Sequence, residues 1–462
     1  MIFTQYYLDC LSQASYLVAD EDSRKAVIVD PRRDVEEYLA DARELGLTIV
    51  GVINTHFHAD FLSGHLELAK ATGAWIGYGD AATAEFEIRA LHDGERIPLG
   101  GPDGVTLEIM ATPGHTPESI SVLVFEHGTD EVAHGVLTGD ALFIGDVGRP
   151  DLLASIGHTA EELGRMLHDS VQRKLMGLPD AVRVFPAHGA GSACGKNLST
   201  ERQSTIGEQR RSNYACRPMD VDAFLAVVTE GQPSAPGYFV YDATLNRQDR
   251  QLRELDTTVP ALSWEEFEHE VALGARIHDA RDPQEFAAGH LAGAINVPAD
   301  GRMAETVGMV FAPTDRIVLI APEGLEQQVA TRIARIGFDH VVGHLADPEG
   351  AMAAHPDQVA RASRLTVEQA DEAIAAGAVQ LVDIRNAGEV AAGMIPGAHH
   401  IPLAELVARR TDLDPAVPVL VNCAGGWRSS VGASTLRSLG FTDVSDLLGG
   451  YTAWESAHPK AG

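Results

Sequence analysis

The chain has 462 residues, which is too long for one ordinary hydrophobic core, so about three domains are expected. Its formal net charge of −31 disfavours a nucleic-acid partner, because the phosphates would be repelled. No apolar run reaches the roughly 18 residues of a membrane span, and the N-terminus carries no secretory pattern, so no membrane association is expected. Four cysteines are too few for a disulfide framework, which favours a reducing cytoplasm.

The N-terminal part alternates predicted strands and helices. Apolar runs predict strands over residues 26–29 and 48–53, and helical spacing predicts a helix over residues 35–45. Four strand-like runs lead into His or Asp, in Thr55-His56-Phe57-His58, Thr112-Pro113-Gly114-His115, Leu137-Thr138-Gly139-Asp140 and Val184-Phe185-Pro186-Ala187-His188. Because α/β folds place their sites at the carboxyl ends of strands, we expect these side chains to gather at one edge.

The C-terminal part contains an internal repeat. Residues 277–298 align without gaps with residues 381–402. The matching pairs include Asp279/Asp383, Arg281/Arg385, Glu285/Glu389, Gly289/Gly393, Gly293/Gly397 and Pro298/Pro402. Each copy continues into a buried-type strand, over residues 317–321 and 417–422, and then into a loop and an amphipathic helix. The repeat predicts two similar α/β domains, each roughly 100 residues long.

The stretch Thr55-His56-Phe57-His58-Ala59-Asp60-Phe61 contains most of a metal-binding pattern. It resembles the H-x-H-x-D-H motif of the metallo-β-lactamase superfamily. The resemblance covers roughly residues 1–250 and includes, in the right order, Gly114-His115-Thr116-Pro117, Thr138-Gly139-Asp140 and Pro186-Ala187-His188-Gly189. It implies an αββα sandwich for this part of the chain.

Phe61 stands where that motif has its final histidine. In the superfamily, the Asp and the final His of the motif help to hold a second metal. Phenylalanine has no lone pair to offer, so a binuclear hydrolytic centre is disfavoured. His56, His115 and Asp140 remain. Two imidazoles and one carboxylate with open positions form the facial triad associated with Fe(II) and O₂ chemistry.

Within the superfamily, this pattern resembles the persulfide dioxygenases. The resemblance implies one Fe(II) per chain, held by His56, His115 and Asp140. It also implies that four further side chains surround these ligands or line the substrate pocket, namely His58, Asp60, His188 and Arg149. Cys194 follows the last of these histidines closely. We interpret it as a packed thiol and leave open whether it approaches the pocket.

The second copy of the repeat ends its strand at Asn422 and continues with Cys423-Ala424-Gly425-Gly426-Trp427-Arg428-Ser429 before a helix. The glycines permit a tight path in which backbone N–H groups surround the sulfur. The following helix N-terminus and Arg428 add positive potential, which favours a thiolate or persulfide anion at Cys423. We therefore predict Cys423 as a nucleophile and Arg428 as its cationic partner. The predicted persulfide cradle consists of Ala424, Gly425, Gly426, Trp427 and Ser429.

This copy resembles the rhodanese family over nearly all of residues 363–460. The supporting stretches are Leu381-Val382-Asp383-Ile384-Arg385, Ile395-Pro396-Gly397-Ala398, the Cys423 loop and Gly449-Gly450-Tyr451-Thr452-Ala453-Trp454. The resemblance implies that Cys423 carries sulfur. The first copy resembles the same family but has Ala321-Pro322-Glu323-Gly324-Leu325-Glu326 in its loop, without a cysteine. A scaffold or docking role is expected for it.

The whole chain resembles the persulfide dioxygenase–rhodanese fusions. The expected domains are a metallo-β-lactamase-like domain over residues 1–258, a rhodanese-like domain without the cysteine over residues 259–355, and a rhodanese domain over residues 363–462. The resemblance implies that iron and O₂ oxidise a low-molecular-weight persulfide to sulfite. Cys423 then passes sulfane sulfur to sulfite, giving thiosulfate.

Two alternatives remain open. One is a zinc-dependent thioester hydrolase of the glyoxalase II type with appended rhodanese domains. The other is a sulfur-relay protein that performs no oxidation. No motif identifies the thiol that carries the persulfide, so glutathione, coenzyme A and similar thiols remain candidates. A homo-oligomeric state is also left open.

Overall fold

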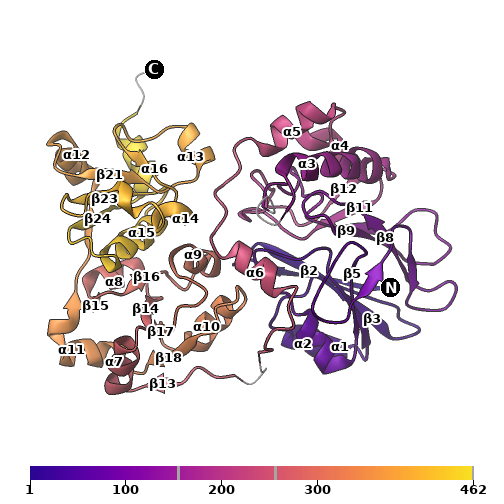
Figure 1. Cartoon of the computed structure of the whole chain (residues 1–462), viewed down its shortest axis with the longest axis horizontal. Coiled ribbons are helices and arrows are strands. Elements are labelled where there is room, and N and C mark those ends of the chain that lie inside the picture. The colour runs from indigo at the N-terminus through magenta and orange to yellow at the C-terminus, as the bar shows by residue number, and fades with distance from the viewer. Residues whose placement is uncertain (153–156, 254–256, 460–462) are drawn as a thin grey trace. The chain divides into compact units, whose positions relative to one another are not determined.

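The computed structural model describes residues 1–152, 157–253 and 257–459. The chain forms two compact units (Figure 1). The first comprises Met1–Gln232 and Phe239–Asp256, and the second comprises Pro233–Tyr238 and Thr257–Gly462. The chain therefore enters the second unit briefly, returns to the first, and then leaves it again. Among the described residues, no helix combines the length and the apolar character needed to cross a membrane. The predicted domain boundaries remain predictions.

Among its described residues, the first unit contains two six-stranded sheets and six α-helices. The strands of the first sheet, in spatial order, are β1 (Ile2–Leu8), β2 (Gln13–Ala19), β3 (Lys25–Val29), β4 (Thr48–Ile53), β5 (Trp75–Gly79) and β6 (Arg89–Leu91). Those of the second are β12 (Ser204–Thr205), β11 (Arg183–Pro186), β10 (Gly135–Gly139), β9 (Ile120–Phe125), β8 (Thr106–Ala111) and β7 (Arg96–Pro98). The helices are α1 (Glu36–Glu44), α2 (His65–Thr72), α3 (Ala160–Asp169), α4 (Ile206–Ser212), α5 (Val221–Thr229) and α6 (Phe239–Leu245).

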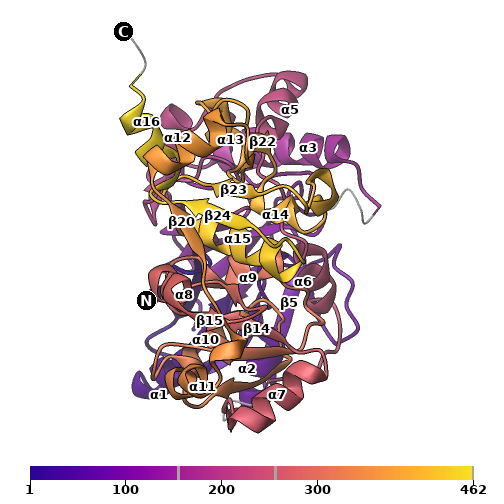
Figure 2. The same cartoon turned by 90° about the vertical axis from the view of Figure 1, so that its left-hand side faces the viewer.

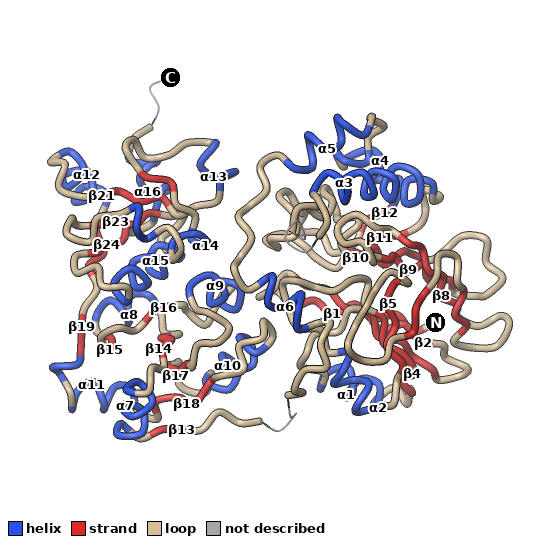
Figure 3. Tube along the Cα trace, in the orientation of Figure 1, coloured by secondary structure: helices blue, strands red, loops and turns tan. Residues whose placement is uncertain are grey.

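The two sheets pack face to face between layers of helices. Figures 1 and 3 show α1 and α2 beside the first sheet, and α3, α4 and α5 beside the second. The expected αββα sandwich is confirmed. The predicted strands over residues 26–29 and 48–53 are β3 and β4, and the predicted helix over residues 35–45 is α1.

Strand β2 illustrates why these residues form a sandwich. All of its residues are buried, and successive side chains point to opposite faces. Tyr16 and Val18 join the core between the sheets, where Val122 of β9 also lies. Leu17 and Ala19 pack on the other face, in the cluster that includes residues of α1. Each fully buried side chain of this size contributes about 1.5–3 kcal/mol, so a strand that is apolar on both faces is stabilised in this interior position.

The carboxyl ends of four strands surround the predicted site. Strands β8, β10 and β11 run in the same direction, because β9 is antiparallel to β8 and β10, and β11 is parallel to β10. Their following loops therefore lie at one edge of the second sheet. Strand β4 contributes the fourth loop from the first sheet. The site is thus built by both sheets at one end of the sandwich.

The second unit contains two five-stranded sheets. In spatial order, the first repeat has β13 (Ala261–Leu262), β18 (Val341–Leu345), β17 (Ile317–Ile320), β14 (Arg276–Asp279) and β16 (Ile295–Asn296). The second repeat has β20 (Ser363–Leu365), β24 (Val444–Leu447), β23 (Val419–Asn422), β21 (Gln380–Asp383) and β22 (His399–His400). A separate pair joins β15 (His290–Leu291) and β19 (Val359–Ala360). All neighbouring strands in the two larger sheets are parallel, which confirms the expected sheet type.

The helices of the second unit follow the same division. The first repeat has α7 (Trp264–Ala272), α8 (Pro283–Ala288), α9 (Met303–Val310), α10 (Glu326–Ala334) and α11 (Pro348–Ala354). The second repeat has α12 (Val367–Ala375), α13 (Ala387–Ala391), α14 (Leu403–Leu406), α15 (Trp427–Ser438) and α16 (Gly450–Ala457). Figure 2 shows α15 between the sheet of its own repeat and the elements of the first repeat.

The two copies of the sequence repeat also make the same contacts between an arginine, an aspartate and a glycine carbonyl. Arg281 pairs with Asp279 at 2.5 Å, and Arg385 pairs with Asp383 at 2.7 Å. Each arginine also donates to the carbonyl of a glycine eight residues later. The same buried pair thus ends the corresponding strand, β14 or β21, in each copy. The two copies therefore share one local architecture.

Side chains of α15 connect the two repeats within the second unit. The hydroxyl of Ser430 donates to Oδ1 of Asn296 at 2.9 Å, and the backbone N–H of Asn296 donates to the Ser434 hydroxyl at 3.0 Å. Nε1 of Trp427 donates to Oδ1 of Asp300 at 2.9 Å. The helix that follows Cys423 is therefore held by the repeat that lacks a cysteine.

Candidate metal centre and sulfur-transfer loop

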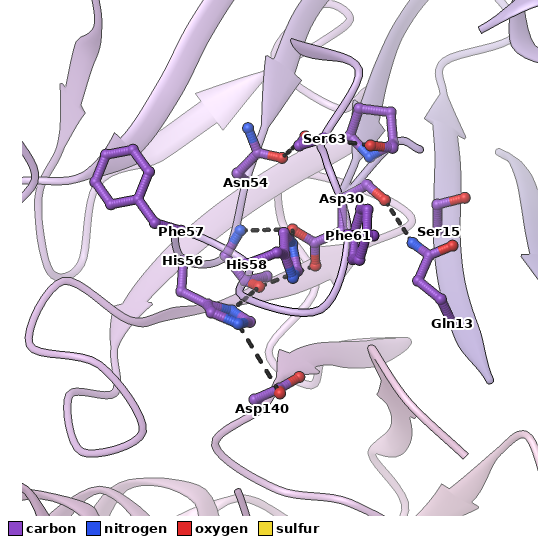
Figure 4. Close-up of polar contacts among 12 residues, drawn as sticks. Gln13, Ser15, Asp30, Asn54, His56, Phe57, His58, Phe61, Ser63 and Asp140 are labelled. Atoms are coloured by element: carbon purple, nitrogen blue, oxygen red, sulfur yellow. Dashed lines mark hydrogen bonds and ion pairs between the residues drawn. The ribbon is translucent and has the colours of Figure 1, made fainter. Parts of the chain in front are cut away.

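His56, His115 and Asp140, which were predicted as metal ligands, lie together in the first unit. One donor atom from each lies within 4.8 Å of the others, and all three side chains are buried. Oδ2 of Asp140 lies 3.5 Å from Nε2 of His115. It lies 3.9 Å from Nε2 of His56, a contact that Figure 4 draws as a dashed line. These distances exceed ordinary hydrogen-bond lengths. Two ligand atoms that are each about 2 Å from one ion are separated by roughly such distances, so the three residues fit a bound metal.

The other ring nitrogens of the two histidines have partners of their own. Nδ1 of His115 donates to the carbonyl of Arg149 at 2.9 Å, and Nδ1 of His56 lies 3.0 Å from the Thr55 hydroxyl. Burial and then the neighbouring histidines, beginning with His58, hold the pKa of His56 well below its usual value. His56 is therefore a neutral imidazole at pH 7, and its Nε2 lone pair is available to a metal.

His58, the second histidine of the H-x-H pattern, has a different partner. Its Nε2 lies 3.0 Å from Oδ1 of Asp30, whose carboxylate also accepts from the N–H and hydroxyl of Thr55 at 2.7 and 2.9 Å (Figure 4). Burial by itself lowers the pKa of His58, but the charge and hydrogen bond of Asp30 outweigh it, so the pKa is raised. Sequence reasoning did not select Asp30. Its place directly after a strand was the available indication.

His58, Asp60 and His188 form a second cluster, with one donor atom from each within 4.8 Å of the others. Nε2 of His188 lies 3.4 Å from Oδ2 of Asp60 and 3.6 Å from Oδ1 of Asp140. Phe61 is completely buried, and its ring centroid lies 4.3 Å from that of His58 and 6.4 Å from that of His188. An apolar ring thus lies against this cluster, in the position where the motif has a histidine.

The backbone carbonyl of Arg149 contacts the cluster of His56, His115 and Asp140. Its carbonyl orients His115, as described above. Its guanidinium donates to both carboxylate oxygens of Asp151, at 2.7 and 2.6 Å, and to the carbonyl of Ala193 at 3.4 Å. The predicted role of Arg149 in the substrate pocket remains a prediction, while its carbonyl holds a candidate metal ligand.

Cys194 reaches the same region. Its sulfur belongs to a third group of donor atoms within 4.8 Å of one another, with Asp140 and His188. Burial, and then the charges of Asp60 and Asp140, raises the pKa of the Cys194 thiol well above its usual value. Cys194 is therefore a buried, neutral thiol at pH 7. The Cys194 sulfur thus lies beside the donor clusters, and its place in a substrate pocket remains open.

Cys423 directly follows β23, and its sulfur lies inside the predicted loop. Sγ accepts hydrogen bonds from the backbone N–H of Gly426 at 3.1 Å and of Ser429 at 3.3 Å. Gly426 has φ of 93°, a conformation that favours glycine. Gly450 packs so closely that a Cβ there would lie 2.4 Å from the Cys423 carbonyl oxygen. Two members of the predicted cradle thus donate to the sulfur, and Ala424 accepts a hydrogen bond from Thr452 at its carbonyl.

Arg428 faces the same pocket as Cys423 but has a carboxylate partner. Its two terminal nitrogens donate to the two oxygens of Glu389, at 2.8 and 2.6 Å. Burial by itself raises the pKa of Glu389, but the hydrogen bond and charge of Arg428 outweigh it, so the pKa lies below its usual value. Sequence reasoning did not select Glu389 as a site residue, although it is one of the residues that match between the two repeats.

A cavity of about 540 Å³ opens in front of Cys423. Gly425 and Trp427 of the predicted cradle line it. Asp300 and Arg302 also line it, and they come from the repeat that lacks a cysteine. The cavity has the size of a small-molecule site, for which about 300–1,000 Å³ is usual. Residues of both repeats of the second unit therefore form the walls of this cavity.

Two family models match the chain. The model of the metallo-beta-lactamase superfamily matches residues 8–188. The model of the rhodanese-like domain matches twice, over residues 263–347 and 366–457. The first match contains both His/Asp clusters of the first unit, and the second and third coincide with the two sequence repeats.

The proteins that are similar in sequence to this chain include enzymes of two kinds. The mitochondrial persulfide dioxygenase ETHE1 of Bos taurus is 33% identical over 178 residues, which cover 38% of this chain and 63% of that protein. The hydroxyacylglutathione hydrolase of Rhodospirillum rubrum is 30% identical over 236 residues, which cover 50% of this chain and 80% of that protein. The chain thus spans slightly less than two thirds of the bovine relative.

One solved structure resembles a larger part of the chain. It is a metallo-beta-lactamase from Staphylococcus aureus, with 31% sequence identity and a TM-score of 0.66. The similarity covers 74% of this chain and 98% of that protein. The first unit contains fewer residues than this 74% of the chain. The similarity therefore extends into the second unit.

Proposed function

The chain belongs to the metallo-beta-lactamase superfamily and carries two rhodanese-like domains, and from this we propose that it is an iron-dependent persulfide dioxygenase coupled to a sulfurtransferase. The proposed first reaction converts a persulfide RSSH, O₂ and water into the thiol RSH, sulfite and two protons. The proposed second reaction transfers a sulfane sulfur to sulfite and gives thiosulfate. The similarity to a persulfide dioxygenase supports the first reaction, and the Cys423 loop supports the second.

The unequal environment of the two H-x-H histidines is the observation that carries the first part. His56 offers its Nε2 in one cluster with Asp140 and His115. His58 directs its Nε2 to Asp30 and has only its unpaired Nδ1 left for the second cluster, against which the Phe61 ring lies. This arrangement supports a single ion on His56, His115 and Asp140. Fe(II) held by these three residues would supply the redox chemistry between the persulfide sulfur and O₂. The chain itself orients His115 through the carbonyl of Arg149 and keeps the site buried.

At the second centre, the Cys423 thiolate would attack the outer sulfur of a persulfide. A sulfur–sulfur bond forms at Cys423 and the sulfur–sulfur bond of RSSH breaks. The leaving thiolate takes the proton and departs as RSH, which leaves a persulfide anion on Cys423. Sulfite then attacks the outer sulfur on Cys423, which forms thiosulfate and restores the Cys423 thiolate. The N–H groups of Gly426 and Ser429 would stabilise negative charge on the sulfur, together with the N-terminus of α15.

A second candidate function is zinc-dependent thioester hydrolysis. Two observations favour it, the similarity to a hydroxyacylglutathione hydrolase and the second donor cluster of His58, Asp60 and His188. Phe61 counts against it, because its ring lies against that cluster and offers no ligand atom. A sulfur-relay protein without oxidation is the third reading, supported by the Cys423 loop alone.

Metal analysis of anaerobically purified protein, combined with O₂ uptake on a panel of persulfides, separates these functions. The proposal predicts one iron per chain and O₂ consumption that depends on a persulfide. Two zinc ions and hydrolysis of a glutathione thioester would establish the second candidate instead. Sulfur transfer to a protein acceptor, with no O₂ uptake on any persulfide, would establish the third.

The partners belong to this proposal as well. We propose glutathione, coenzyme A or a similar low-molecular-weight thiol as the persulfide carrier, with O₂ and sulfite as co-substrates, and the panel decides among the carriers. All four cysteines are buried. We propose a reducing compartment such as the cytoplasm, because four cysteines are too few for a disulfide framework in a chain of 462 residues.

A further inference from the structure

The segment between the two units returns to the first unit and contacts the loop that carries His56 and His58. Residues 239–256 belong to the first unit, although residues 233–238 and the chain from residue 257 onward belong to the second. The returning segment begins with α6 and lies outside the part matched by the superfamily model, residues 8–188. Asn246, directly after α6, is completely buried.

Asn246 makes three hydrogen bonds to the backbone of the loop that joins β4 to α2. Its Nδ2 donates to the carbonyls of His58 and Phe61, both at 2.8 Å. Its Oδ1 accepts from the backbone N–H of Ser63 at 2.9 Å. The reverse orientation of the amide would place its oxygen against two carbonyl oxygens, so the orientation with three hydrogen bonds is the favourable one.

Arg250 extends this contact. It donates from Nη2 to the Ser63 carbonyl at 2.7 Å, and its guanidinium binds both oxygens of the buried Glu67 carboxylate, at 2.6 and 2.9 Å. Four backbone groups of the loop are therefore partnered by two side chains that come 183 to 188 residues later in the chain. Buried backbone groups are almost always paired, so the loop depends on this segment for its conformation.

We infer that Asn246 is a positioning residue of the metal centre. It holds the backbone at His58 and at Phe61, and Asp60 lies between these two fixed points. The inference rests on the proposed metal site, whose ligand His56 opens the same loop. Without the amide, two carbonyls and one N–H lose their partner, and the loop reorganises to recover hydrogen bonds. The donor atoms of the loop then lose their alignment.

The test uses the full-length chain with Asn246→Ala. Two quantities are measured, the affinity for Fe(II) in competition with a chelator and the visible absorption spectrum of the protein loaded with Co(II). Affinity is expected to fall about 10- to 100-fold, the usual effect of losing a group that holds metal ligands in place. The cobalt bands are expected to shift. Asn246→Asp keeps the acceptor for Ser63 and loses both donated hydrogen bonds, so it should act in the same direction and carries the test if the alanine variant does not fold.

Asp20→Ala is the matched control. Asp20 is 5% exposed and accepts from the backbone N–H groups of Ser23 and Val105, at 2.7 and 3.0 Å. It follows the far end of β2, whose first residue, Gln13, pairs with His188. The control should lower the Tm of the metal-free protein and leave both metal readouts unchanged.

Unchanged Fe(II) affinity and an unchanged cobalt spectrum in both Asn246 variants would overturn the inference, whatever their Tm. A wild-type chain that binds neither ion would contradict the proposed metal centre itself, and the inference with it. Because the readouts do not depend on turnover, they separate the role of Asn246 from the identity of the reaction.

Discussion

The carboxylate of Asp30 lies 3.0 Å from Nε2 of His58, and this contact makes the two histidines of the H-x-H sequence unequal. His56 keeps the corresponding nitrogen for Asp140 and His115, in the cluster that fits one ion. The short sequence His-Phe-His therefore supplies two different groups. His56 is a neutral imidazole whose Nε2 faces the first cluster, and His58 is held at Nε2 by the Asp30 carboxylate, which leaves only its Nδ1 for a second ion.

The first prediction concerns this difference. Replacing His115 with Ala should remove the bound iron and abolish O₂ consumption, because a ligand is lost. Replacing His58 with Ala should leave iron bound, with slower turnover. His127→Ala is the control, since His127 is exposed and outside the clusters. Iron per chain and O₂ uptake are the measurements. Two tightly bound zinc ions in the native protein, without iron-dependent activity, would contradict the assignment of one iron to this cluster.

The second prediction concerns Phe61. If its ring excludes a second ion, Phe61→His should raise the metal content toward two ions per chain, using Asp60 and His188. Phe61→Leu is the matched control, because it removes the ring without adding a ligand atom. Elemental analysis of both variants decides the question. An unchanged metal content in Phe61→His would show that the pocket excludes a second ion by other means, such as its shape or the position of Asp60.

The third prediction compares two buried cysteines. The Cys423 sulfur accepts hydrogen bonds from two backbone N–H groups. By contrast, burial and then the charges of Asp60 and Asp140 raise the pKa of the Cys194 thiol. Sulfur transfer to cyanide or sulfite should therefore vanish in Cys423→Ser and persist in Cys194→Ser. Substantial transfer by the Cys423→Ser protein would place the carrier elsewhere, with Cys194 the first residue to examine.

The fourth prediction concerns the pair of Arg428 and Glu389. Arg428→Ala should reduce sulfur transfer by about 10-fold or more, because a cation beside an anionic substrate is lost. Glu389→Gln should raise transfer with anionic acceptors modestly, since a negative charge leaves the pocket. The free energy of unfolding should change by less than about 1 kcal/mol in Glu389→Gln, because the pair is partly exposed. Slower transfer in Glu389→Gln would show that Glu389 chiefly holds Arg428 in place.

The pH dependence of that pair has a definite sign. Although burial opposes it, Arg428 lowers the pKa of Glu389, so the carboxylate stays ionised through the neutral range. Any stability that the ionised pair contributes is present above the ordinary glutamate pKa and is lost as the pH falls through the lowered value. The ratio of wild-type to Glu389→Gln transfer rates should therefore stay constant near pH 7. A ratio that changes there would contradict the lowered pKa.

Local sequence patterns predicted individual strands, the helix over residues 35–45 and the repeat, whereas the sandwich and the donor residues were implied by the resemblance to known families. His56, His115 and Asp140 each follow a strand in the structure, and the motifs around them are short enough to be recognised in the sequence. The same holds for Cys423, whose loop lies between a strand and a helix. These elements are predictable because their chemistry depends on neighbours within a few residues.

Partners that are distant in sequence were not predictable in this way. Asp30 contacts His58 across 28 positions, Glu389 contacts Arg428 across 39, and Asn246 reaches Phe61 across 185. Nothing in the residues between them indicates these contacts, because they arise from the packing of separate elements. The same reason applies to the cavity in front of Cys423, whose walls come from both repeats.

The products formed from a persulfide and O₂ test the two-centre account most directly. Wild-type protein should accumulate mainly thiosulfate, because sulfite from the metal centre is consumed at Cys423. The Cys423→Ser variant should keep most of its O₂ uptake and accumulate sulfite instead, since the metal cluster shares no residue with the Cys423 loop. Chromatography of the products, corrected for the spontaneous reaction of sulfite with persulfide, gives the answer. Thiosulfate as the main product of the Cys423→Ser protein would contradict the account.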